Sequence, residues 1–288
     1  MIMEFRKSKI AYFILLIFTC AVILVLFLPR VQIVNGEEVL TPILPHGPVV
    51  QNPVMRWIGI IVGLFAAQMV ASAGAASLGN KEFQKLASKL LNACDSEAFF
   101  ADAAPLSQKG NRQSTLVKNY MLGKGYIATG EFEKAIELFE ETEREAAVDW
   151  ITHDMRISLC GAYANACIAY AETNQPEAAV RLYSKLRATA DATVGNKDAF
   201  AAADYIRMMT RDYVAIFAKE GFSDTDAIEQ DIDKASSEYD RVLLHYALAR
   251  LQERLGNRER AERSYRYVAE NGNTFACVQA AREHLRRA

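Results

Sequence analysis

The 288 residues allow one or two domains. Its hydrophobic content of 51% is high for a protein in which 24% of the residues are charged, although the formal net charge is only -2. The apolar excess is concentrated near the N-terminus, so part of the chain is expected to lie in a membrane.

The first apolar segment covers residues 10–28. It contains no charged residue and would span roughly 28 Å of hydrocarbon at about 1.5 Å per residue. A secretory signal peptide is the alternative, because the preceding tail 1–9 is basic. However, the run is longer than a signal core and ends at Pro29 without an A-x-A cleavage pattern. We therefore predict a transmembrane helix over 10–28.

The second apolar segment covers residues 57–76 and is also predicted to span, although Gln68 and Ser72 weaken its insertion signal. Small residues recur at every fourth position, which would let another helix approach closely: Gly59, Gly63, Ala67, Ala71 and Ala75. We expect this stripe to pack on the first helix of the same chain, with a homodimer through the second helix as the alternative. Gln68 is then expected to form a hydrogen bond across the contact.

Basic residues predict the orientation of the two spans. The tail 1–9 and the segment after residue 76 each carry three, whereas the loop 29–56 carries only Arg30 and Arg56. The positive-inside rule therefore places both termini in the cytoplasm and the loop outside. In this loop Asn35-Gly36 predicts a two-residue hairpin turn between β-forming residues. We expect the loop to be a covalent link, with ligand sensing as the alternative.

No sequence motif for catalysis is present. Nucleophile elbows, HExxH, P-loop and dinucleotide signatures are missing, and LGKGY at 122–126 lacks the glycine and hydroxyl residue of a P-loop. The five cysteines include no CxxC pair, and the four histidines show no metal-ligand spacing. Cys160 and Cys167 are seven apart, which suits packing residues on one helix face. The sequence therefore predicts no metal, no cofactor and no enzymatic activity.

Residues 120–142 predict two short helices separated by a turn at Thr129-Gly130. Small and large residues follow the spacing of a known repeat: Leu122, Gly123, Tyr126, Ala135 and Phe139. This stretch resembles the tetratricopeptide repeat (TPR) family. Related hairpins begin near Cys160 and Val242, but Gln252 replaces the expected tyrosine in the third, and the family's closing proline is absent from all three. Gly123 and Ala135 are expected where the two helices of the first hairpin touch.

The remaining C-terminal sequence is also predicted to be helical. Asn80 could cap a helix over 81–93 and Asp95 another over 96–108. Further helices are expected over three ranges: 197–220, 225–235 and 274–287. The predicted fold is all-α, with two transmembrane helices followed over 77–288 by a cytoplasmic TPR-like α-solenoid of about five helical hairpins and a C-terminal capping helix.

The resemblance implies a concave groove lined by the first helix of each hairpin. At residue level the lining would comprise Tyr120, Lys124, Asn165, Tyr246 and Arg250. Aromatic and basic groups of this kind suit a peptide with an acidic or carboxylate end. The two-carboxylate clamp of the family's chaperone-binding members is incomplete here, because Leu243 and Ala247 stand where basic residues would be needed.

Charge is uneven along the predicted solenoid. Residues 131–149 carry eight acidic residues and two basic ones, whereas residues 250–288 carry nine arginines and five glutamates. This polarity could steer a charged partner. The alternation of arginine and glutamate near the C-terminus favours i,i+3 and i,i+4 pairing over binding of lipid or nucleic acid.

These features predict a prokaryotic protein of the cytoplasmic membrane that acts as a scaffold or adaptor, with the lipid bilayer and an unidentified protein or peptide as its partners. Two alternatives remain open. A reversed orientation would make the solenoid an extracytoplasmic, chaperone-like assembly factor. Docking of a partner on the small-residue stripe would instead make the protein a noncatalytic regulatory subunit of a membrane enzyme or transporter.

Overall fold

The protein is predominantly α-helical, as predicted. A computed structural model describes residues 6–27, 29–34, 37–42, 53–107, 112–146, 152–218 and 224–287. The chain divides into two compact units, Met1–Phe83 and Gln84–Ala288.

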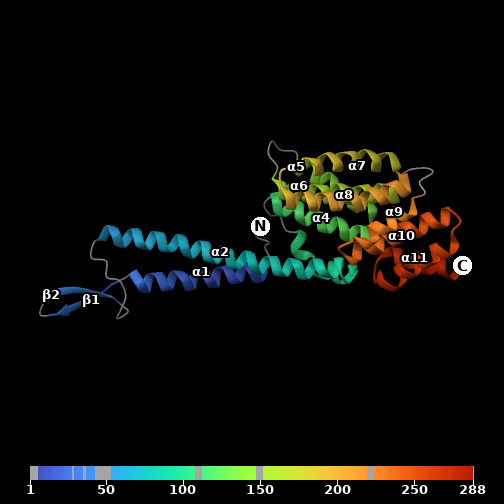
Figure 1. The fold of residues 1–288 in the computed structure, drawn as a ribbon. Coiled ribbons are helices and arrows are strands. Elements are labelled where there is room, and N and C mark those ends of the chain that lie inside the picture. The colour runs from blue at the N-terminus through green and yellow to red at the C-terminus, as the bar shows by residue number, and fades with distance from the viewer. Residues whose placement is uncertain are drawn as a thin grey trace. The chain divides into compact units, whose positions relative to one another are not determined.

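The first unit contains two helices and a small hairpin (Figure 1). Its elements are α1 (Arg6–Phe27), β1 (Pro29–Val34), β2 (Glu37–Pro42) and most of α2 (Pro53–Leu91). The two strands pair antiparallel with Val34 opposite Glu37. The register is that of a two-residue connection, and the predicted turn residues Asn35 and Gly36 lie outside the described residues.

Helix α2 runs unbroken from Pro53 to Leu91, so the separate helix predicted over 81–93 is wrong. Asn80 lies inside α2 and caps nothing. The neighbouring Gly79 costs a helix about 1 kcal/mol, which is too little to end a long helix. Among the described side chains, Ile60–Leu91 is the helix long and apolar enough to cross a membrane, and the apolar stretch Ile10–Ile23 of α1 is shorter.

The small residues of α2 lie against α1. A β-carbon on Gly63 would be 2.9 Å from Ile23 Cγ2, and one on Gly74 would be 2.6 Å from Leu15 Cδ1. The other small residues of the stripe whose side chains are described are buried: Ala67, Ala71 and Ala75. The side-chain surroundings of Gly59 lie outside the described residues. Gln68 accepts a hydrogen bond of 2.7 Å from the hydroxyl of Tyr12.

The second unit begins with short helices and continues as four antiparallel hairpins among the described residues. The short helices are α3 (Ser96–Asp102) and the 3-10 helix η1 (Ala104–Ser107). The hairpins pair α4 (Arg112–Thr129) with α5 (Phe132–Ala146), α6 (His153–Glu172) with α7 (Pro176–Asp191), α8 (Lys197–Ala218) with α9 (Thr225–Asp233), and α10 (Glu238–Arg254) with α11 (Arg258–Asn271). Helix α12 (Ala276–Arg287) follows. As predicted, Asp95 caps α3, accepting a bond of 2.9 Å from the Ala98 N–H. The α-helix predicted over 96–108 ends at Asp102, however, and Ala104–Ser107 forms the 3-10 helix instead.

Three of the hairpins turn through a residue with left-handed backbone conformation at the same point. Gly130, Asn174 and Gly256 have φ of 76°, 59° and 76°. In each case the next N–H bonds back to the carbonyl five residues before it, at 2.9, 2.8 and 2.8 Å. This hydrogen-bond pattern ends a helix in a Schellman turn, which glycine and asparagine favour. Pro176 then opens α7, where its missing N–H costs nothing.

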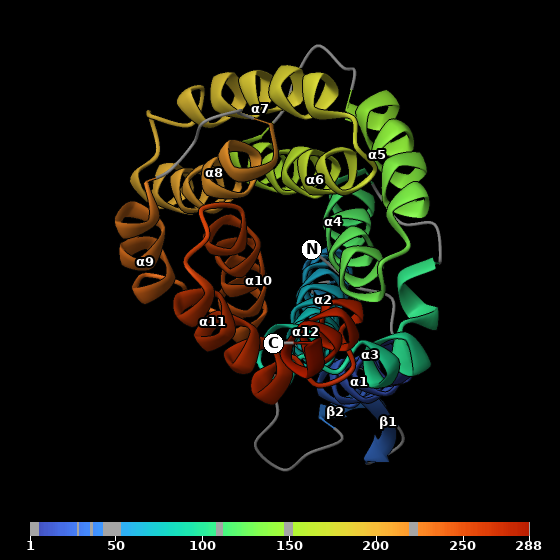
Figure 2. The same ribbon diagram turned by 90° about the vertical axis from the view of Figure 1, so that its right-hand side faces the viewer.

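The hairpins of the second unit close into a ring (Figure 2). Helices α4, α6, α8 and α10 lie inside, and their partners lie outside. The ring closes where the α11–α12 turn meets the residues before α3, a contact that we call the seam (residues 93–96 and 273–274). Thr274 Oγ1 accepts a bond of 2.8 Å from the Ser96 N–H, and Asn273 Nδ2 donates one of 3.0 Å to the Ala93 carbonyl.

Candidate partner site inside the ring

Two predicted groove residues interlock helices α4 and α6. A β-carbon on Gly161 would lie 2.4 Å from the ring of Tyr120, and one on Gly123 would lie 2.5 Å from Asn165 Nδ2. Asn165 also donates a bond of 2.9 Å to the Tyr120 carbonyl. Gly123 therefore faces α6 of the next hairpin, and its contact with α5 of its own hairpin stays a prediction. The two glycines allow the inner helices to approach closely.

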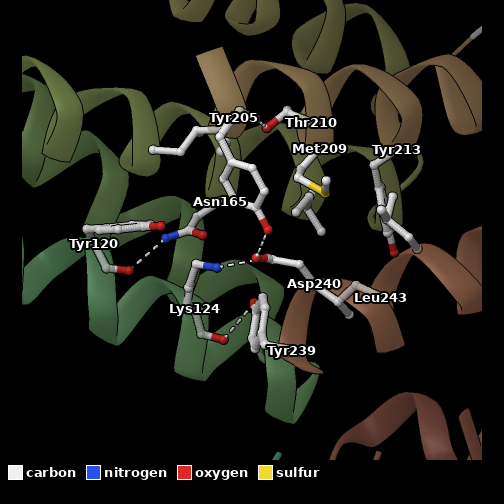
Figure 3. A pocket seen from close by; sticks show the side chains of 14 residues that line it. Tyr120, Lys124, Asn165, Tyr205, Met209, Thr210, Tyr213, Tyr239, Asp240 and Leu243 are labelled. Atoms are coloured by element: carbon white, nitrogen blue, oxygen red, sulfur yellow. Dashed lines mark hydrogen bonds and ion pairs between the residues drawn. The ribbon is translucent and has the colours of Figure 1, made fainter. Parts of the chain in front are cut away.

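The third groove residue, Lys124, is buried in an ion pair at the centre of the ring (Figure 3). Its Nζ lies 3.0 Å from Asp240 Oδ1 on α10 and 4.2 Å from the centre of the Tyr239 ring. The hydroxyl of Tyr205 on α8 donates a bond of 2.8 Å to Asp240 Oδ2. This cluster ties three inner helices together.

The pKa values at this ion pair reflect its charges. Burial opposes the charged form of Lys124, but Asp240, Tyr120 and Tyr239 together outweigh it, so the pKa of Lys124 lies above its ordinary value. Burial likewise opposes ionisation of Asp240, but Lys124 and three hydrogen bonds outweigh it, so the pKa of Asp240 is lowered. Both groups are therefore charged at neutral pH.

The space beside the ion pair is small. Its volume is about 40 Å³, and its walls include Tyr120, Lys124 and Asn165. A water molecule needs roughly 10–15 Å³ of such space, so the cavity has room for a few water molecules. The structure thus brings these predicted groove residues together, but their side chains contact neighbouring helices of the ring instead of lining an open groove.

The other two predicted groove residues, Tyr246 and Arg250, line an open pocket of about 580 Å³, which we call the mouth pocket. Arg250 Nη1 lies 2.9 Å from Glu172 Oε2, and its guanidinium is stacked 4.1 Å from the centre of the Phe217 ring. Tyr213 donates a further hydrogen bond to Glu172. The remaining walls come from α10 and α12: Glu253, Arg254 and His284.

A smaller apolar pocket of about 140 Å³ adjoins the mouth pocket and shares Glu172 and Tyr246 with it. We call it the side pocket. Its walls are mainly apolar and come from α4, α5, α10 and α12: Ile127, Phe132, Leu243, Ala276, Cys277 and Ala280. The two pockets together offer space for an apolar side chain next to polar groups.

The sequence interpretation did not identify Glu172, Glu253 and His284. His284 Nδ1 lies 3.1 Å from Glu253 Oε1, and its ring stacks 4.6 Å from that of Tyr265. No local spacing signals this cluster, because its residues meet only when α12 folds back across the ring. Within the described residues, no group of three or more His, Cys, Asp or Glu side chains could hold a metal ion.

The cysteine side chains of the ring are largely removed from solvent. Cys94, Cys160 and Cys167 are buried, and burial raises the pKa of Cys94 and Cys160 to about 12. Cys277 lines the side pocket, and burial likewise raises its pKa to about 12. These thiols are therefore protonated at neutral pH.

The TPR resemblance rests on the residue spacing and is a prediction from the sequence. Comparison with protein-family models, curated proteins and solved structures found no match to this chain.

Proposed function

We propose that the protein is a membrane-anchored scaffold or adaptor, in which a TPR-like solenoid closed into a ring binds another protein at the cytoplasmic face of the membrane. The observation that carries the proposal is the distribution of exposed large apolar side chains. Among the described residues, all but Val180, Val194 and Leu255 lie on α1 and α2. Phe65 and Met69, at 72% and 71% exposed, are examples.

Exposed apolar surface costs about 25 cal/mol per Å² in water, so these faces suit lipid. The proposal includes both predicted spans, with each terminus in the cytoplasm as the basic flanks predict. The contacts of Gly63 and Gly74 with α1 support packing of the α2 stripe within the chain. They therefore favour an adaptor over a subunit that docks its partner on that stripe.

The mouth pocket and side pocket are the proposed partner site. The outer surface of the ring has few exposed apolar residues, and the space at its centre is small. A segment that inserts an apolar side chain into the side pocket would place its backbone among Tyr246, Arg250 and Glu172. These groups could form hydrogen bonds with it.

Membrane anchoring is tested by charge on the exposed apolar face. The double variant Phe65→Glu/Met69→Glu loses no internal packing, yet should reduce the membrane-bound fraction, because a carboxylate near the bilayer centre costs about 3 kcal/mol. The control is Val194→Glu, which changes a similarly exposed residue in the α7–α8 turn. Alkaline extraction of membranes followed by immunoblotting measures the bound fraction. Equal retention of both variants would contradict the anchor.

The partner site is tested by crosslinking in intact cells. A photoreactive residue at Arg254, in the mouth pocket, should crosslink a protein, whereas one at the exposed Arg181 on the outer helix α7 should not. Ala280→Phe should fill the side pocket and remove the crosslink, and Ala201→Phe, at an exposed site on α8, should leave it unchanged. A crosslink that survives Ala280→Phe would place the partner elsewhere.

A further inference from the structure

Helix α5 presents an acidic face on the outside of the ring. Five exposed glutamates follow one side of the helix: Glu133, Glu137, Glu140, Glu141 and Glu145. Three of their spacings are i,i+4, at which like charges repel each other and destabilise a helix. None of these glutamates forms an ion pair with any residue that the structure describes; the acids of this region that do are Glu131 and Glu143. Lys134 and Arg144 on the same helix offset only part of this negative charge.

Helices α11 and α12 present a complementary arginine face. The predicted pairing of arginine with glutamate is confirmed for Arg258, Arg263 and Arg287, which contact acids one turn away. Four other exposed arginines form no ion pair in the described part of the chain: Arg260, Arg266, Arg282 and Arg286. Arg282 Nη2 lies 3.5 Å from the Ala269 carbonyl of α11, which joins the two helices into one face.

The acidic face and the α11 part of the arginine face lie apart within one ring. Figure 2 shows α5 and α11 on opposite sides of the ring. The outer surface between them has few exposed apolar residues, so a contact made there must depend on polar groups. Two exposed faces of opposite net charge on one molecule are complementary to the faces of a second copy.

We infer that the protein self-associates head to tail, with the acidic face of α5 in one copy docked on the arginine face of α11 and α12 in the next. The two faces differ, so each pair of copies leaves one acidic and one arginine face unoccupied. A contact of this heterologous type continues to add copies unless its rotation closes a larger assembly. Self-association of this kind is independent of the proposed partner site.

The test uses the full chain in a neutral detergent, which excludes anionic lipid. Sedimentation velocity should show assemblies that grow with protein concentration and weaken by about tenfold or more in affinity when NaCl rises from about 50 to about 500 mM. Glu137→Arg/Glu141→Arg and Arg282→Glu/Arg286→Glu should each abolish the assemblies. Mixing these two variants should restore them, because the reversed faces are again complementary. Arg181→Glu/Lys197→Glu, which reverses exposed charges outside both faces, should have no effect.

Three results would overturn the inference. One is a single copy per micelle at every protein concentration in low salt. Another is an assembly that persists in high salt and in both reversed variants, which would assign it to the apolar helices. The last is failure of the mixed variants to associate. If Arg282→Glu/Arg286→Glu changes only the binding of phosphatidylglycerol vesicles, the arginine face is a lipid-binding surface instead.

Discussion

Lys124 and Asp240 form an ion pair of 3.0 Å between helices α4 and α10, which lie in the first and last of the four hairpins that the structure describes. The two residues are 116 positions apart in the chain. In an open array of repeats each hairpin contacts only its neighbours, and no such pair would form. This ion pair and the seam are therefore what distinguishes the ring from an open array.

Removing one member of this ion pair should strongly destabilise the ring. Lys124→Met leaves Asp240 buried and uncompensated, which should lower the free energy of unfolding by about 3–5 kcal/mol, and Asp240→Asn should have a similar effect. The double variant should lose less than the sum, because neither charge is then left alone. Chemical denaturation of the full chain in detergent, followed by circular dichroism, measures all three variants. Additive losses would mean that the two side chains do not interact.

Asp212 on α8 should make stability depend on pH. One of its carboxylate oxygens is buried with no hydrogen-bond partner in the described residues, and Asp231 of α9 lies beside it. Burial raises the pKa of Asp212 from 3.8 to about 6. Asp231 adds to this rise, and Arg211 opposes it. The folded state therefore holds the proton more tightly than the unfolded chain does.

The stabilisation from this proton is fully present below the unfolded pKa and is lost as pH rises through about 6. The free energy of unfolding of the wild type, relative to that of Asp212→Asn, should therefore decrease between about pH 4 and about pH 7. Using the difference between the two proteins cancels the titration of the exposed carboxylates. A constant difference across this range would show that Asp212 keeps its ordinary pKa.

A side chain at Gly256 should lower stability because of the left-handed backbone conformation alone. An added β-carbon would have no atom within 4 Å, yet the residue has φ of 76°. Gly256→Ala should therefore cost about 1 kcal/mol of stability. Gly195→Ala is the matched control, since its β-carbon would also meet nothing and its φ is not left-handed. Equal melting temperatures for the two variants would contradict this account.

A substitution at Thr274, on one side of the seam, should destabilise α3 on the other side. Thr274→Val removes the hydroxyl that accepts bonds from Ser96, 178 positions away, at a cost of about 1 kcal/mol. Hydrogen exchange of the α3 amides should then accelerate. Thr189→Val, whose hydroxyl bonds only to its own helix, should leave α3 unchanged. If α3 exchanges at the same rate in both variants, Thr274 does not hold the ring closed.

The sequence predicts local structure in this protein better than it predicts contacts between hairpins. Gly130 and Gly256 mark turns through their backbone preferences, and Asp95 and Pro176 mark helix starts, because each acts on neighbouring residues. Asn80 failed as a marker because a capping residue inside a continuous helix has no end to cap. Local hydrogen bonding therefore accounts for both the successes and this failure.

The candidate site depended on information that one repeat does not contain. Tyr120, Lys124 and Asn165 were expected to face a groove, but Gly161, Asp240 and Gly123 come from other helices to cover them. Glu172 and His284 gained a role only when α6 and α12 came together at the mouth pocket. Ring closure is a property of the whole row of hairpins, and a repeat motif does not encode it.

The seam also constrains synthesis and evolutionary change. Asn273 is synthesised 180 residues after Ala93, its partner across the seam. Native structure at the start of the ring therefore waits until the whole ring has been synthesised, which leaves the nascent chain dependent on protection from aggregation. Duplicating or deleting one hairpin would separate the two sides of the seam, so the gene cannot gain or lose repeats as an open array can.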